Sequence, residues 1–223
     1  ARARIVIAVI LLATALAAAP AAAPAAAPAE SSELDSVVTH WSGVLARRES
    51  AEGPASPGVA QALHTLGTAQ RNAGRSLEAL TSYRRALEIR ERVLGPEHTD
   101  VAWTLNNFAN ALFDLGDYAQ AADLHRRAFA IRERAHGPDH ADVALSLNNL
   151  ANAIERDGDP RAAVALHESA LAIRERTFGP WDRSVAQSLN NLGLALMQLG
   201  ALERARALYQ RSIAIRDSLL GPG

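Results

Sequence analysis

The sequence predicts an all-α protein built as a stack of similar helix pairs, and three observations predict it. A Gly-Pro pair recurs every 42 residues, apolar residues between these pairs follow helical spacing, and no alternating strand pattern competes with them. A repeat of this length is typical of a solenoid, in which each unit buries its apolar face against its neighbours. The repeated glycines are Gly53, Gly95, Gly137, Gly179 and Gly221, and the four full units are 53–94, 95–136, 137–178 and 179–220.

A capping helix over residues 31–52 is predicted before the first unit. Ser32 and Asp35 resemble a capping box at its start, and apolar residues follow one side of the helix. We expect the helix to cover the open face of the first unit, because a terminal repeat needs a cap. Its apolar side consists of Leu34, Val37, Val38, Trp41, Val44 and Leu45.

Each unit contains two helices, which we call its A helix and its B helix. The Gly-Pro pair stops the preceding B helix, and a glycine in the left-handed conformation is expected to end the A helix. Small residues on the buried side of the B helix let two helices approach closely. The expected N-caps of the A helices are Gly58, Asp100, Asp142 and Ser184, and the glycines expected to end them are Gly74, Gly116, Gly158 and Gly200.

The two ends of the chain have their own patterns. Residues 1–19 combine two arginines with an apolar run and predict a signal peptide or a signal anchor, followed by an Ala/Pro-rich linker over 20–30. Either form places the repeats outside the cytoplasm, in the periplasm or extracellular space, and membrane contact is expected only if the segment is uncleaved. Residues 221–223 are the start of a further repeat or the chain end. The last B helix is expected to expose Ile213, Leu219 and Leu220, which self-association would cover.

The repeat pattern resembles the tetratricopeptide repeat of the 42-residue, kinesin-light-chain-like type, which also occurs in many bacterial multidomain proteins. The second unit carries the resemblance most clearly, with VAWTLNNFANALFDLGDYAQAADLHRRAFAIRERAHGPDH. The resemblance implies a right-handed α-solenoid of four helix pairs plus the capping helix. It also implies a non-enzymatic scaffold that binds a peptide or protein segment in a concave groove formed by the A helices.

Asparagines recur on the polar side of the A helices and are the main candidates for this groove. An asparagine amide can pair with an extended peptide backbone whatever the side chains of the peptide are. The alternative is that these asparagines bond to the neighbouring helix and hold the repeats together, and both roles can apply to different members. The candidate peptide-binding residues are Asn106, Asn107, Asn110, Asn148, Asn149, Asn152, Asn190, Asn191, Trp103, Phe113 and Arg156. Further groove positions are Gln61, Arg71, Asn72, Asp114, Glu155, Met197 and Gln198.

Composition excludes several kinds of chemistry. The chain has no cysteine and no lysine, which removes thiolate and lysine nucleophiles and zinc–thiolate sites. A formal net charge of −1 gives no reason to expect nucleic acid as a partner. No metal site and no cofactor are predicted, because Gly137-Pro138 breaks any helix that would align His136 with His140. An alternative function is a recruiting or sensor part of a larger bacterial enzyme, such as a protease or a protein kinase.

Two other repeated patterns have structural interpretations. Arginines recur near the ends of the B helices, and we expect them to form a solvated strip with local ion pairs rather than a polyanion site. His125 and His167 stand where the other two units have Tyr83 and Tyr209, so we expect them to be packing residues. The arginines are Arg90, Arg92, Arg132, Arg134, Arg174, Arg176 and Arg216.

Overall fold

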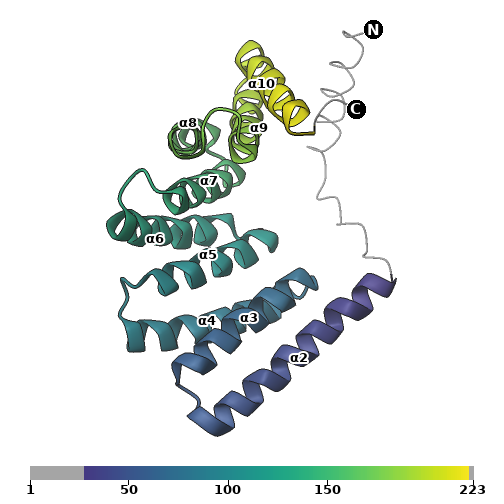
Figure 1. Cartoon of the computed structure of the whole chain (residues 1–223), viewed down its shortest axis with the longest axis vertical. Helices are drawn as coiled ribbons and strands as arrows, with labels where there is room; N and C mark the ends of the chain where they lie inside the picture. The colour runs from purple at the N-terminus through teal and green to yellow at the C-terminus, as the bar shows by residue number, and fades with distance from the viewer. Residues whose placement is uncertain (1–27, 221–223) are drawn as a thin grey trace.

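The computed structural model describes residues 28–220 and confirms the all-α solenoid. The described helices form a curved stack, with α5, α7 and α9 nearer its inner side than α6 and α8 (Figure 1). The predicted segment 1–19, linker residues 20–27 and residues 221–223 lie outside the described residues. The helices are α2 (Pro28–Glu52), α3 (Pro57–Asn72), α4 (Ser76–Leu94), α5 (Thr99–Asp114), α6 (Tyr118–His136), α7 (Ala141–Arg156), α8 (Pro160–Phe178), α9 (Arg183–Gln198) and α10 (Leu202–Leu220).

The A helices α3, α5, α7 and α9 begin earlier than the sequence predicts. Their N-caps are Ser56, His98, His140 and Asp182, two residues before the predicted ones. In α5, the Nδ1 atom of His98 accepts a hydrogen bond from Asp100 N at 3.1 Å. Histidine is not among the usual N-cap residues, which explains why sequence preferences alone pointed to Asp100.

Glycines end the A helices as predicted. Gly74, Gly116, Gly158 and Gly200 have φ of 75°, 85°, 107° and 75°, a conformation that strains any residue with a Cβ. After α3, the backbone N–H of Arg75 reaches back to Gln70 O at 2.8 Å, as in a Schellman motif. The tight turn lets the B helix fold back against its own A helix.

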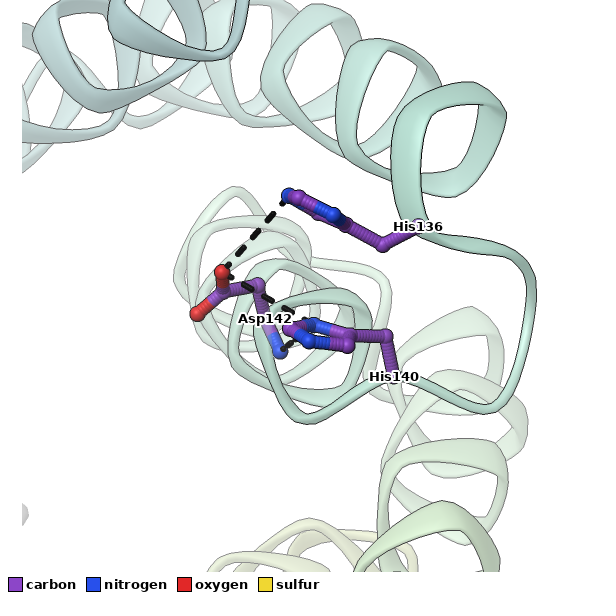
Figure 2. A group of neighbouring side chains, drawn as sticks. All are labelled: His136, His140 and Asp142. Atoms are coloured by element: carbon purple, nitrogen blue, oxygen red, sulfur yellow. Dashed lines mark hydrogen bonds and ion pairs between the residues drawn. The ribbon is translucent and has the colours of Figure 1, made fainter.

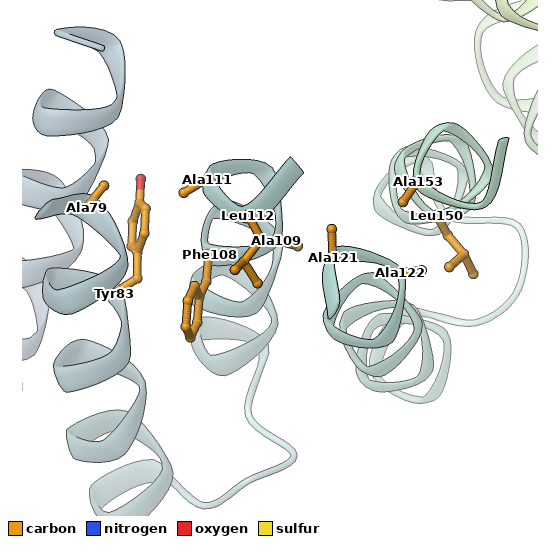
Figure 3. Close-up of a cluster of buried hydrophobic side chains, with 10 residues drawn as sticks. All are labelled: Ala79, Tyr83, Phe108, Ala109, Ala111, Leu112, Ala121, Ala122, Leu150 and Ala153. Atoms are coloured by element: carbon orange, nitrogen blue, oxygen red, sulfur yellow. The ribbon is translucent and has the colours of Figure 1, made fainter. Parts of the chain in front are cut away.

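The core is a chain of small clusters rather than one large centre. One cluster spans the first three units, and six of its ten buried residues, all labelled in Figure 3, are alanines from four helices: Ala79, Ala109, Ala111, Ala121, Ala122 and Ala153. Alanine buries little apolar area, but it allows neighbouring helices to come close. The stack is therefore held by many short-range contacts between adjacent helices.

Within each unit, one A-helix residue and one B-helix residue are complementary in size: the smallest residue at the A-helix position, glycine, faces the largest residue at the B-helix position, tyrosine. A Cβ atom added to Gly67 would lie 2.8 Å from the ring of Tyr83, and the equivalent distance from Gly193 to Tyr209 is 2.9 Å. The middle units instead have alanine and histidine at these positions. Their residues are Ala109 with His125 and Ala151 with His167, all buried.

The helix before the first unit is longer than predicted. It starts at Pro28, so Ser32 and Asp35 lie inside it and do not form its N-terminal capping box. Asp35 instead pairs with Arg75 of the first unit, with Oδ1 and Nη2 2.7 Å apart. Val38 is buried and Trp41 packs beside it against α3, while Val37 is 44% exposed. Only part of the apolar side therefore covers the first unit.

Among the described helices, none is both long enough and apolar enough to cross a membrane.

Candidate binding face on the A helices

Four positions of each A helix remain accessible and define the A-helix face of the protein. They follow a spacing of i, i+4, i+7 and i+11, which places them along one side of a helix. The face consists of Gln61, Thr65, Thr68 and Asn72 in α3, Trp103, Asn107, Asn110 and Asp114 in α5, Leu145, Asn149, Asn152 and Arg156 in α7, and Gln187, Asn191, Leu194 and Gln198 in α9.

The first residues of two asparagine pairs, Asn106 and Asn148, are not available to a ligand. Asn106 and Asn148 are only 4% and 3% exposed. The amide of Asn149 donates to Oδ1 of Asn106 at 3.0 Å, and the amide of Asn191 donates to Oδ1 of Asn148 at 2.8 Å. The expected peptide-binding role is therefore wrong for Asn106 and Asn148, because these buried amides join adjacent A helices.

The first unit makes the same link with a histidine. Nδ2 of Asn107 lies 3.2 Å from Nε2 of His64, and the histidine nitrogen accepts because an amide nitrogen can only donate. Burial, together with the nearby Arg90 cation, lowers the pKa of the His64 imidazole to about 4. His64 is therefore neutral at pH 7, as an acceptor must be.

A second set of contacts joins the C-terminal ends of the same helices. Arg71 Nε and Asp114 Oδ2 are 2.6 Å apart, and Gln198 Nε2 donates to Glu155 Oε1 at 2.6 Å. Between them, the Arg156 guanidinium lies 5.9 Å from the ring centre of Phe113. Each of these pairs is separated by 43 residues, as are the asparagine pairs. The predicted groove positions Phe113, Arg156 and Glu155 thus also link the repeats.

Other predicted positions stay open. Trp103 is 43% exposed, and one of its ring faces is covered by Arg132, whose guanidinium carbon lies 4.8 Å from the ring centre. Asn110, Asn152 and Asn190 are partly exposed and make no side-chain hydrogen bond with any described residue. Asn72 is exposed, whereas Met197 is half-buried against the core of the last unit.

The arginine strip is only half solvated, which corrects the sequence interpretation. Arg90, Arg132 and Arg174 are 6%, 1% and 6% exposed. Each bonds to the A helix of the following unit: Arg132 Nη1, for example, donates to Ser146 Oγ at 2.8 Å. The alternate arginines fit the prediction, since Arg134 pairs with Glu97 at 2.5 Å on the surface. Each buried arginine therefore connects one repeat to the next.

The A-helix face itself carries little net charge. The Arg71 and Asp114 charges neutralise each other, and Arg156 is held by a hydrogen bond to the hydroxyl of Tyr118 at 2.7 Å. The remaining members of the face are mostly amides, with Trp103, Leu145 and Leu194 as apolar points. Such a surface can offer hydrogen bonds and apolar contact, but not strong attraction to a charged ligand.

Comparison with known proteins places these features in context. A family model for the tetratricopeptide repeat matches residues 38–92, 59–134 and 100–176, and a second model for the same repeat matches 185–223. The chain is similar to the solved structure of BtubC (BKLC) from P. vanneervenii, at 22% identity and a TM-score of 0.70, over 85% of this chain and 93% of that one. It is also similar to a putative kinesin light chain from Podosopora anserina with nearly identical TPR-like repeats, at 22% identity and a TM-score of 0.75, over 86% and 92%. No curated protein sequence matches the chain.

Proposed function

Since this chain belongs to the tetratricopeptide repeat family, whose members generally mediate protein–protein interactions, we propose that its A-helix face binds an extended, uncharged peptide segment. One observation carries the proposal. Some polar groups of the face bond to the neighbouring repeat, but other amides and the tryptophan of the face remain accessible. Asn110 and Asn152 occupy the same position in successive units, so they recur along the stack.

The chemistry of these residues suits a peptide backbone. Each amide offers two donors and an acceptor, and an extended backbone presents both kinds of group along its length. Trp103 offers a large rigid surface, of the kind that anchors many protein interfaces. Because Asp114 is paired with Arg71, Arg156 keeps the one unpaired charge among the members of the face, and this small net charge favours a segment without a strong net charge of its own.

Selection of binders from a random peptide display library on the immobilised full chain tests the proposal. Selected peptides should bind the wild-type chain and lose about thirtyfold or more in affinity to Trp103→Ala, since truncating such an anchor costs about 2 kcal/mol or more. Asn110→Ala with Asn152→Ala should also weaken binding. Gln210→Ala, an exposed amide on α10, is the matched control and should leave affinity unchanged.

Asn107, Asn149 and Asn191 are poor test positions, because alanine there removes a bond between repeats. Circular dichroism melts of each variant separate loss of binding from loss of folding. Peptides that bind all the variants equally would place the binding site elsewhere.

Self-association is a second candidate function, favoured by exposed apolar residues on α10. Ile213 and Leu219 are 48% and 55% exposed. Sedimentation equilibrium should then show dimers that Leu219→Glu dissociates, whereas a monomer at high concentration would exclude this candidate.

Export through residues 1–19, a bacterial origin and a place within a larger enzyme are further proposals, which the full reading frame and cell fractionation would test.

A further inference from the structure

Two histidines and an aspartate meet where the second unit joins the third. His136 is the last residue of α6, His140 is the N-cap of α7, and Asp142 lies in the first turn of α7 (Figure 2). Oδ2 of Asp142 lies 4.0 Å from His136 Nε2 and 3.7 Å from His140 Nδ1. The two imidazole rings stack with their centres 4.4 Å apart. The turn at Gly137-Pro138, which was expected to keep the histidines apart, brings them together.

This combination departs from the repeat pattern. The residue equivalent to His136 is Leu94 at the preceding junction and Phe178 at the following one. The preceding junction otherwise has the same pair, His98 and Asp100, with Nδ1 and Oδ2 4.0 Å apart. His136 is therefore the single replacement that turns a capping pair into a group of three possible ligands. Packing does not explain it, because His136 is an exposed residue.

The geometry points to a binding site for a divalent transition metal ion, with His136, His140 and Asp142 as its ligands. The three ligand atoms already lie within 4.8 Å of one another. In a tetrahedral zinc site with bonds of about 2 Å, ligand atoms are roughly 3.3 Å apart, so modest side-chain rotations would close the group. Two imidazoles and a carboxylate are ligands that suit zinc and its neighbours rather than calcium or magnesium. Water would complete the coordination.

Binding would exchange one local interaction for another. Nδ1 of His140 now accepts the backbone N–H of Asp142 at 3.2 Å. A metal on Nδ1 displaces this hydrogen bond, and a metal on Nε2 leaves the proton on Nδ1, which can then no longer accept. In return, the ion would tie the end of α6 to the start of α7. The site should therefore have moderate affinity and should stabilise the junction of the two middle units.

Isothermal titration of the untagged full chain with zinc chloride tests this proposal. The wild-type chain should bind about one equivalent, and excess zinc should raise its melting temperature. His136→Leu, which restores the residue of the preceding junction, should keep the fold and lose zinc binding. Leu94→His should build the same three ligands at the preceding junction and bind about two equivalents.

The natural pair His98 and Asp100 is an internal control, since it lacks the third ligand in the wild-type chain. Zinc binding that survives in His136→Leu would overturn the proposed ligand set. Absence of binding by a folded wild-type chain would reduce the three residues to a stacked pair beside a helix cap. Neither result depends on the peptide-binding function.

Discussion

The two middle units and the two outer units solve the same packing problem with different pairs of residues. The outer units combine a glycine in the A helix with a tyrosine in the B helix, and the middle units combine alanine with histidine. The glycines are required where they occur, because a Cβ at Gly67 or Gly193 would press on the tyrosine ring. The two facing residues therefore have to change together, because changing either one alone leaves a steric clash or a void.

The units also differ in their links to the neighbouring repeats: the last unit lacks the buried arginine of the first three, and the boundary between the middle units lacks an ion pair found at the others. Arg132 is 1% exposed and bonds to the following A helix, whereas its counterpart Arg216 in the last unit is exposed. Ion pairs join two consecutive B helices at two boundaries, Glu91 with Arg127 and Glu175 with Arg211, and the equivalent pair of Glu49 with Arg85 joins α2 to the first B helix. At the boundary between the middle units, Ser169 stands at the arginine position, opposite Glu133.

Removing the buried Arg132 should cause the largest loss of stability among the changes considered. Arg132→Ala leaves a void and takes away the donor to Ser146 Oγ and to the carbonyl of Asp142. We expect a loss of about 2–4 kcal/mol in the free energy of unfolding, measured by urea titration. Arg216→Ala, the matched change at the exposed position, should lose less than about 0.5 kcal/mol. Equal losses in the two variants would contradict the role given to Arg132.

Lowering the pH should destabilise the protein through the buried histidine of a middle unit. Burial, and after it the Arg132 cation, lowers the pKa of His125 to about 4. The unfolded chain protonates this residue near pH 6.5 and the folded chain does not, so stability falls as the pH drops from 6.5 to 4. Between pH 6.5 and 4, His125 should lower the free energy of unfolding by an amount on the order of 2–3 kcal/mol.

The double variant Ala109→Gly with His125→Tyr should remove this contribution, because it gives the second unit the outer pair. Chemical denaturation at several pH values measures the difference. An unchanged pH dependence in the double variant would assign the acid sensitivity to other groups, of which the buried His64 is the first to examine.

Disrupting the glycine–tyrosine pair of an outer unit should lower the stability somewhat less than the two preceding changes. Gly67→Ala places a methyl group against Tyr83, at a penalty of about 1–3 kcal/mol. The better helix propensity of alanine returns up to about 1 kcal/mol of it. Adding Tyr83→His should recover stability, because the two changes together recreate the pair of a middle unit. Thermal melts of both variants measure the recovery, and a single variant as stable as the wild type would show that Tyr83 moves freely.

The smallest effect is expected from completing the ladder of B-helix ion pairs. Ser169→Arg would place a guanidinium opposite Glu133 at the boundary between the middle units. Both positions are accessible to solvent, so the gain should be about 0.2–1 kcal/mol and should shrink in high salt. Urea titrations at low and high salt would measure it. A gain that persists in high salt would have to come from packing instead.

Much of this protein could be predicted from its sequence because the local signals repeat. The 42-residue period, the two helices of each unit and the glycines that end the A helices depend on nearby residues and on backbone conformation. The exchange of tyrosine for histidine between copies was also visible and indicated packing residues, but the match of each to a glycine or an alanine of the A helix came from the structure. Helix starts were less predictable, because His98 and His140 act as caps through a ring nitrogen rather than through a short oxygen side chain.

The sequence by itself determined which residues are polar and how often they recur, but the stacking of helices decided what those residues do. Neighbouring A helices meet with an offset of 43 residues, so Asn106 faces Asn149 and becomes buried, while Asn110 stays accessible. The same packing buries Arg132 and leaves Arg134 in solvent. The turn between units brings His136 next to His140. Each outcome depends on the angle and distance between helices, which no single segment of the chain contains.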